Sequence, residues 1–201
     1  MANTKKAAIE LSISTIVIIV LAMAMLIGGL VLIRNIGNTA TQTVSTLDDK
    51  VQSAIANLFS DEGSDVVVKL GNDHTAKINA GTDNFGLAIG ARTPDGTATD
   101  RNRLKYKLSL QTDASGGNNC VKIMGLDNTK KLFLSPPIGA DSAFEQIQGA
   151  NAYARVILSI PAGTSACTQK VFVDVTDTKS SPAAYVGGDF FIVQVQKASL
   201  F

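Results

Sequence analysis

The pattern of hydrophobic and polar positions changes sharply along this chain, and its most apolar stretch lies near the N-terminus. From Ile16 to Ile33 the chain has 18 residues without a charge or a hydroxyl, and 14 of them are large aliphatic or methionine side chains. Leaving these side chains in water would cost roughly 20–40 kcal/mol, which exceeds the whole stability of an ordinary domain. The pattern therefore predicts a helix buried either in lipid or in the core of a multi-chain assembly.

The length and flanks of the run fit a membrane helix. A helix of about 18–23 apolar residues is roughly 27–35 Å long, close to a hydrocarbon core of about 30 Å. Lys5 and Lys6 precede the run and only Arg34 follows it closely, so the positive-inside rule predicts a cytoplasmic N-terminus. An ordinary secretory signal fits less well, because its apolar region spans about 7–15 residues, whereas the small-x-small triplet beginning at Ala22 lies inside the run.

Helical periodicity continues beyond the apolar run as a single stripe. The stripe consists of Val44, Leu47, Val51, Ile55, Leu58 and Phe59, a spacing typical of one face of a 3.6-residue helix. We therefore expect one long helix over residues 8–60, apolar over 11–33 and amphipathic over 44–59, whose stripe docks on the chain's own C-terminal domain. Two helices with a short hinge near Gly37 and Asn38 are the alternative.

After residue 65 the composition changes to short β-type segments separated by turn-forming residues. The expected strands are Val66–Leu70, Thr75–Asn79, Phe85–Ile89, Arg103–Gln111, Val121–Met124, Lys131–Leu134, Ala154–Ile160, Lys170–Thr176 and Asp189–Gln196. About eight or nine short strands within 65–201 favour an antiparallel sandwich, with a capped helical turn at Asp141–Gln148. The predicted fold class is α+β, a long N-terminal α-helix followed by an antiparallel β-sandwich-like domain.

Cys120 and Cys167 are the only cysteines and lie 47 positions apart. Outside the membrane an even pair usually forms a disulfide, and closing this loop would stabilise the domain by about 4 kcal/mol in the chain-entropy model. Two buried free thiols are the main alternative. Metal ligation is disfavoured, because two cysteines and one distant histidine form a poor site.

Candidate catalytic chemistry is sparse in this sequence. The single histidine, His74, directly follows Asp73, and adjacent side chains point apart in an extended segment, so a Ser/His/Asp arrangement is not indicated. The sequence has no phosphate-binding glycine loop, His-Glu-x-x-His motif or Cys-x-x-Cys pair. The stretch 95–100 fails the EF-hand spacing and is interpreted as a polar turn. No enzymatic activity and no cofactor are expected.

Four cations recur at alternate positions and would share one face of a strand: Arg101, Arg103, Lys105 and Lys107. We expect a solvated outer face or protection of a sheet edge, with a contact between subunits as the alternative. From Asp48 onward 15 Lys and Arg stand against 16 Asp and Glu. This part of the chain is nearly neutral, and no nucleic-acid partner is expected.

The stretch from Lys5 to Ser12, Lys-Lys-Ala-Ala-Ile-Glu-Leu-Ser, leads directly into the apolar run. It resembles the class III signal of archaeal type IV pilin-like proteins, a family that includes adhesive pilins and archaellins. The resemblance implies that a prepilin peptidase cuts between Ala7 and Ala8, with Lys6 preceding the cut site. Residues 1–7 would be the leader, and the apolar helix would stay on the mature chain. An uncleaved signal anchor is the alternative.

The resemblance also implies contacts between subunits. Glu10 would be the third mature residue, whereas bacterial pilins carry a glutamate at the fifth position. Its carboxylate would lie at the lipid headgroups, near the positive end of the helix dipole, or pair with a neighbour's α-amine. Ala24 and Gly28 form a small-xxx-small spacing that permits close contact between helices.

The resemblance implies a structural subunit of an archaeal type IV pilus-like surface filament, with helices in the core and β-domains outside. The partners would be copies of the chain in a helical filament, the prepilin peptidase and, before assembly, membrane lipid. The precursor would lie in the cell membrane with a cytoplasmic N-terminus, and the assembled chain in an extracellular filament, whether adhesive pilus or archaellum. The alternative is an uncleaved membrane-anchored cell-surface binding or coat protein with a single β-domain.

Overall fold

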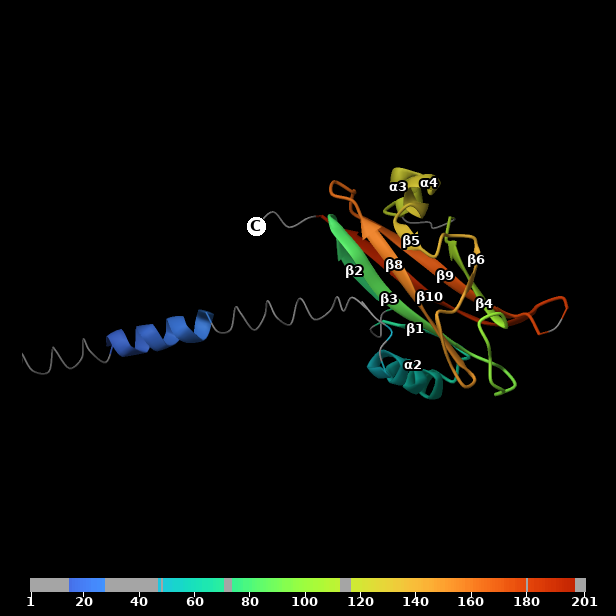
Figure 1. The fold of residues 1–201 in the computed structure, drawn as a ribbon. Helices are drawn as coiled ribbons and strands as arrows, with labels where there is room; N and C mark the ends of the chain where they lie inside the picture. The colour runs from blue at the N-terminus through green and yellow to red at the C-terminus, as the bar shows by residue number, and fades with distance from the viewer. Residues whose placement is uncertain are drawn as a thin grey trace, which may run out of the picture. The chain divides into compact units, whose positions relative to one another are not determined.

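A computed structural model describes residues 15–27, 47, 49–70, 74–112, 117–179 and 181–197 (Figure 1). The chain divides into two compact units, Met1–Ala40 and Thr41–Phe201, and each is described by itself. In the first unit, residues 15–27 are helical. Among the described residues, no helix combines the length and the apolar character needed to cross a membrane.

In the second unit the structure describes three helices and two five-stranded sheets. Sheet I has the order β1-β3-β8-β5, with β7 also paired to β8, and sheet II has the order β2-β10-β9-β4-β6. Every described strand pair is antiparallel except β10 with β2, which is parallel. The helices are α2 (Asp49–Glu62), α3 (Cys120–Met124) and α4 (Leu126–Lys130). The strands of sheet I are β1 (Val66–Lys69), β3 (Thr82–Arg92), β5 (Phe133–Ser135), β7 (Gln146–Gln148) and β8 (Asn151–Ile160). Those of sheet II are β2 (Thr75–Asn79), β4 (Leu104–Leu110), β6 (Asp141–Ala143), β9 (Cys167–Asp177) and β10 (Ala184–Gln196).

The main core lies between the two sheets and follows from alternation along their strands. In β9 every second residue from Cys167 to Asp177 is buried, as expected when successive side chains point to opposite faces. Val173 of sheet II belongs to the same buried cluster as Leu87 and Leu158 of sheet I. The β-sandwich expected from the strand pattern is therefore present.

Helix α2 covers part of the outer face of sheet I, over β1, β3 and the start of β8, so that this part of the sheet is buried on both sides (Figure 1). Ile55 of α2 is fully buried in a second cluster with Val67, Ala88 and Tyr153. Gly90 of β3 lies directly under the helix, because a Cβ at this position would collide with Ile55 Cγ2. The apolar side of α2 docks on the chain's own sheet, as its helical spacing predicts.

The α+β fold class, with one long N-terminal helix over residues 8–60, is wrong. The described structure is mostly β, and the helical residues in this region are 15–27 and, separately, those of α2. Leu47 lies outside α2 and is not helical. Residues 8–14, 28–46 and 48 of the expected helix lie outside the described residues.

The start of α2 explains why periodicity did not reveal this break. Leu47 is buried in the cluster around Ile55 even though it precedes the helix. Gln52 donates a hydrogen bond from Nε2 to the carbonyl oxygen of Leu47 at 3.1 Å. Leu47 continues the apolar stripe of α2 and is buried, although it is not helical. The spacing of apolar residues therefore cannot show where α2 begins.

The strand expected at Val121–Met124 is also wrong, because these residues belong to α3. Asn119 caps this helix by accepting a hydrogen bond from the backbone N–H of Lys122. Asn is among the most favourable residues at a helix N-terminus, and its effect exceeds the β-propensity of two β-branched residues in a segment of five.

The helical turn expected within Asp141–Gln148 is replaced by strands β6 and β7. Asp141 pairs with Lys107 of β4, and Gln146 pairs with Tyr153 of β8. The segment therefore passes from sheet II to sheet I. Pairing with two strands that are already in place outweighs the local capping signal, since propensity is a weak guide against tertiary contacts.

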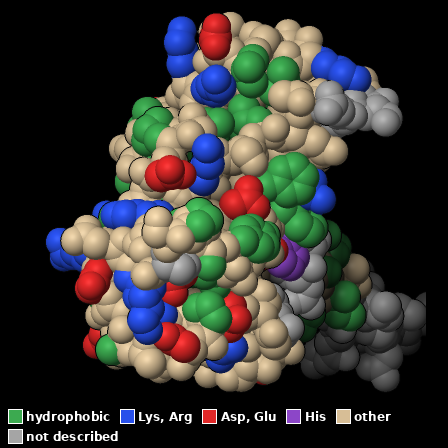
Figure 2. Space-filling model, turned by 90° about the vertical axis from the view of Figure 1, so that its right-hand side faces the viewer, with side chains coloured by type: hydrophobic (Ala, Val, Ile, Leu, Met, Phe, Trp, Pro, Cys, Tyr) green, Lys and Arg blue, Asp and Glu red, His purple; other side chains and the backbone are tan. Residues whose placement is uncertain are grey.

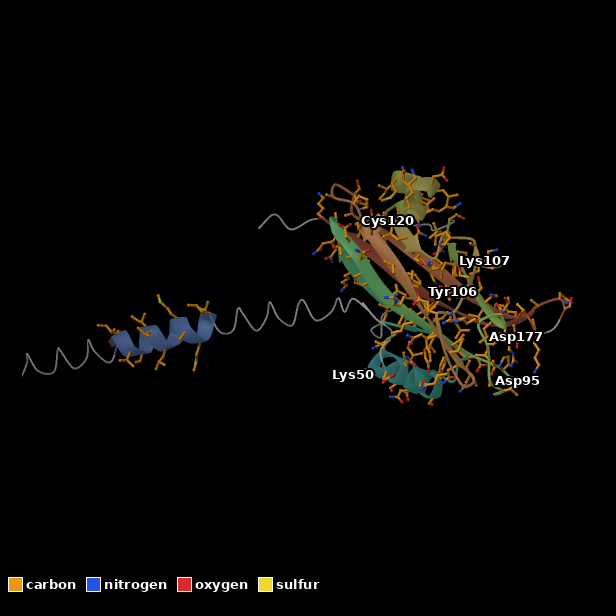
Figure 3. All side chains as sticks on the ribbon, viewed as in Figure 1. Lys50, Asp95, Tyr106, Lys107, Cys120 and Asp177 are labelled. Carbon is orange, nitrogen blue, oxygen red and sulfur yellow. A yellow bond between two sulfur atoms is a disulfide. The ribbon has the colours of Figure 1, made fainter. Side chains whose placement is uncertain are left out.

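Cys120 and Cys167 form the expected disulfide, with their Cα atoms 5.0 Å apart. Both cysteines are buried. The bond joins the first residue of α3 to the first residue of β9, and Figure 3 shows Cys120 at the end of the sandwich next to α3. The bond thereby holds α3 against the end of sheet II.

Replacing Gly90 with alanine should destabilise the second unit. The new methyl group would meet Ile55 and Phe59 and push α2 away from sheet I, and overpacking of this kind typically costs about 1–3 kcal/mol. Urea unfolding followed by circular dichroism measures the effect. Gly117→Ala is the control, because a Cβ there meets open space. Equal stability of the two variants would show that α2 does not dock closely at Gly90.

Candidate functional site

The helical residues 15–27 present apolar side chains in all directions. Every large hydrophobic side chain from Ile16 to Ile27 is between 49% and 77% exposed, and the range contains no charged residue. A helix that is apolar all round is stable only with apolar neighbours on every side. This helical segment is therefore a candidate site for contact with lipid or with other helices.

Ala24 is the one residue of the expected processing and subunit-contact set that the structure describes. It lies within the helical residues 15–27 and is exposed. A small side chain at such a position lets a second helix approach closely. The other members of the set lie outside the described residues: Lys6, Ala7, Ala8, Glu10 and Gly28.

A network of charged side chains at one end of the sandwich is centred on Arg103. Arg103 directly precedes β4 and donates to both carboxylate oxygens of Asp177 at 2.8–3.2 Å. The same guanidinium donates to Asp95 Oδ1 at 2.9 Å and to Thr97 Oγ1 at 2.6 Å. Lys179 Nζ donates to Asp95 Oδ2 at 2.9 Å. Figure 3 shows Asp95 and Asp177 at the same end of the domain, where the network joins the loop before β4 to the end of β9.

These contacts hold the carboxylates of the network in their charged form. Hydrogen bonds from Arg103 lower the pKa of Asp177, against the opposing effect of burial. Hydrogen bonds from Lys179, Thr97 and Arg103 lower the pKa of Asp95. Asp177 in turn raises the pKa of the Arg103 guanidinium. Two anions and two cations therefore neutralise one another, and the network offers little net charge to a ligand.

An open pocket of about 380 Å³ borders this network, lined by Thr97, Ala98, Asp100, Asn102, Arg103, Thr178 and Lys179. The polar side chains that line it bond one another or the local backbone. Asp100 accepts from the N–H groups of Asn102 and Arg103, and Thr178 donates to their carbonyl oxygens. In the part of the chain that the structure describes, no group of three or more His, Cys, Asp and Glu could hold a metal ion. The arrangement is a structural junction.

His74 directly precedes β2, and its side chain is half-buried. Its ring stacks on Phe190 with centroids 5.3 Å apart, and Nδ1 lies 3.2 Å from the carbonyl oxygen of Phe190 and 3.7 Å from Asp189 Oδ1. Asp189 accepts hydrogen bonds from the backbone N–H groups of Val68 and Phe190, both at 2.7 Å. Because Val68 belongs to β1 and Asp189 to β10, this carboxylate links the two sheets. These contacts assign both side chains a structural role.

Sequence reasoning did not find the pairing of Arg103 with Asp177. The sequence predicted that the cations from Arg101 to Lys107 share one solvent-exposed face of a strand. However, β4 begins at Leu104, so the alternation of side chains along the strand does not determine where Arg103 points. Asp177 could have indicated this pairing, because it lies two residues after Val175 on the buried face of β9 and is itself buried. A carboxylate at an inward position needs a charged or hydrogen-bonding partner.

No family model matches the chain, and no curated protein matches it. Among solved structures, the GspB Siglec domain is 12% identical with a TM-score of 0.39, and the match covers 66% of this chain and 57% of that chain. The PapD-like domain 7 of human CEP192 is 14% identical with a TM-score of 0.37, covering 69% and 88%. A family 123 glycoside hydrolase from Clostridium perfringens is 13% identical with a TM-score of 0.28, covering 71% and 25%. Similarity at this level identifies neither a family nor an activity.

Replacing Asp177 with asparagine should destabilise the sandwich at neutral pH. The variant leaves Arg103, whose side chain is only 10% exposed, without its main carboxylate partner, and hydrogen bonds to charged groups contribute about 1.5–3 kcal/mol. Denaturant unfolding at pH 7 measures the loss. Asp127→Asn, at an exposed position of α4, is the matched control and should change stability little.

The same pair of variants has a second readout in acid. Because the pKa of Asp177 is lower in the folded chain, its contribution is fully present above the unfolded value of about 3.9. It is lost as the pH falls below that value towards the folded pKa. The wild type and Asp127→Asn should therefore lose more stability between pH 5 and pH 2 than Asp177→Asn. Parallel pH profiles for all three proteins would contradict this role.

Proposed function

We propose that the chain is a structural subunit of an archaeal type IV pilus-like filament on the cell surface. The observation that carries the proposal is the helical stretch 15–27, whose exposed apolar side chains require apolar partners all round. In the filament these helical segments pack in the core against copies of themselves, and the β-sandwich units form the outer layer.

The N-terminal sequence supports this assignment. Lys6, Ala7 and Ala8 resemble the processing site of the archaeal type IV pilin-like family. A prepilin peptidase that cuts after Ala7 leaves the apolar stretch on the mature chain. The precursor lies in the cell membrane with its N-terminus in the cytoplasm, and lipid contacts the apolar side chains until neighbouring subunits replace it.

Assembly of this kind depends on close packing between helices. Moving an apolar helix from lipid into a protein bundle changes its surroundings little, so van der Waals contact has to favour the bundle. Ala24 offers a small side chain for such contact, with Gly28 four positions later.

The sandwich supports a structural role outside the cell. The disulfide of Cys120 and Cys167 is of a kind that persists in oxidising surroundings. Asp189 and Arg103 each tie separate segments together through charged hydrogen bonds. The titratable groups of these clusters contact one another and the backbone, as expected of a scaffold.

The test combines mass spectrometry of the N-terminus with electron microscopy of material sheared from cells. We expect filaments that contain the chain and a mature sequence that begins at Ala8. A chain found only as detergent-extracted monomer and still carrying Met1 would overturn the proposal. That result would select an uncleaved, membrane-anchored cell-surface protein.

A carboxylate within the apolar stretch should prevent assembly. Leu21→Asp places a charge among side chains that have to pack against apolar neighbours, and an aspartate at the centre of a membrane helix costs about 2.5–3.5 kcal/mol. Sheared filament yield should therefore fall by about tenfold or more, since tenfold corresponds to ~1.4 kcal/mol. Leu21→Met, which conserves volume and polarity, should keep the yield of the wild type. Filaments from Leu21→Asp at normal yield would show that this segment is not buried.

A further inference from the structure

The outer face of sheet II carries an apolar centre that the strand pattern alone does not reveal. Burial alternates along β9 and the C-terminal part of β10, so the residues between the core positions point to this outer face. Phe172 and Phe190 lie directly opposite each other across the two strands, and Ile192 is the next outward residue after Phe190. All three are half-buried. We call these three side chains the apolar centre.

Lys170 and His74 cover part of the apolar centre. The Lys170 ammonium lies 3.7 Å from the ring centroid of Phe190 and 5.2 Å from that of Phe172, within the range of cation–π contacts. The His74 ring stacks on Phe190, and Figure 2 shows the chain's histidine beside hydrophobic side chains, with acidic and basic side chains nearby. Aromatic side chains with a charged surround are typical of the centre of a protein–protein interface.

Lysines outnumber carboxylates around the apolar centre. By strand register the charged residues of this outer face are Lys77, Lys105, Lys107 and Lys170 against Asp141 and Asp174. In the part of the chain that the structure describes, no helix or third sheet is packed over the middle of this face. The outer face of sheet II therefore combines an apolar centre with a net positive surround.

Helix α2 carries the opposite charge on the other side of the same unit. Its sequence holds Asp49, Asp61 and Glu62 against a single Lys50, and both aspartates are exposed. Because α2 packs on the outer face of sheet I, while the apolar centre lies on the outer face of sheet II, two layers of strands separate the two charged surfaces.

We propose that the outer face of sheet II docks on helix α2 of a second copy of this chain. The proposal rests on the filament proposed above and names a contact between its outer domains. The contact joins two different surfaces of each subunit, and such heterologous contacts repeat as open helical arrays unless the rotation closes a ring. The lysines of sheet II meet the carboxylates of α2, and contact with the second copy removes the apolar centre from water.

Charge distribution favours a second copy over a polyanion. The outer face of sheet II has two more lysines than carboxylates, and α2 has two more carboxylates than lysines, so surfaces of opposite and equal formal charge meet when two copies dock. Asp141 and Asp174 flank Lys107 in one row of sheet II, and they would repel a nucleic acid or an anionic lipid surface. A carboxylate-bearing helix can avoid these two positions, whereas a uniformly charged polymer would lie across them.

Charge reversal on one surface and compensation on the other tests this docking in the full chain expressed in cells. Lys77→Glu with Lys105→Glu makes the outer face of sheet II acidic, and like charges across an interface cost several kcal/mol. The yield of sheared filaments should fall by about tenfold or more. Asn57→Lys with Asp61→Lys, both exposed positions of α2, should lower the yield similarly. Combining the four substitutions should restore filaments.

The control is Lys130→Glu with Lys131→Glu, an equal charge change at exposed positions of α4 and the residue after it, which should leave filament yield unchanged. Thermal unfolding of each purified full chain in detergent checks that the sandwich remains folded. Folded variants that assemble like the wild type would overturn the docking surface and leave the filament standing. Loss of filaments in both reversals without rescue in the combination would overturn the choice of α2 as the partner surface.

The outcome remains informative if the wild type forms no filaments, which would overturn the proposed function itself. Analytical ultracentrifugation of the detergent-solubilised full chain then measures self-association of the same variants. Association that each reversal weakens and the combination restores would support docking between copies. A wild type that stays monomeric at high concentration, or that associates equally in every variant, would overturn it.

Discussion

Part of sheet I, over β1, β3 and the start of β8, has to bury both of its faces, and the arrangement of the second unit depends on this constraint. One face contributes Leu87 and Ile89 to the core between the sheets, and the other carries Val67, Ala88 and Tyr153 under α2. The absence of a side chain at Gly90 lets the helix approach the sheet closely. Without α2, these fully buried side chains would face water at a cost of about 1.5–3 kcal/mol for each large one. The amphipathic helix is therefore an integral layer of the sandwich and more than a connection to the apolar N-terminal segment.

The sequence predicted the strands in which apolar and polar residues alternate, and the disulfide between the two cysteines. Alternation located β9 and β4, Thr75–Asn79 has the bounds of β2, and two cysteines in a β-rich domain form their disulfide. The long helix was wrong because Leu47 satisfies the same apolar stripe whether or not it is helical. The helix at α3 was missed because one hydrogen bond to Asn119 outweighs local β-propensity. Such outcomes depend on tertiary contacts and single caps, which periodicity does not record.

The candidate functional residues also fall into those that the sequence predicted and those that it did not. The apolar character of residues 15–27 is visible in the composition, because it needs no partner within the chain to be recognised. The apolar centre of sheet II could not be found, since Phe172, Phe190 and Ile192 occupy positions that alternation assigns to water. Pairing of β9 with β10 brings them together. Likewise, Arg103 looked like one cation among four until the fold placed it beside Asp177. Contacts of this kind depend on register between strands that are distant in sequence.

The parallel pairing of β2 with β10 has a consequence for the order of folding. Residues 75–79 of β2 pair with residues 192–196 of β10, so β2 cannot join its sheet until more than a hundred further residues have been synthesised. The strands of sheet I, in contrast, can all pair once the chain has been synthesised as far as Ile160. Late closure by distant residues slows folding, since the intervening loop entropy has to be overcome first. Until β10 has been synthesised, β9 therefore lacks its partner on one side, and β2 has no strand to pair with among those the structure describes.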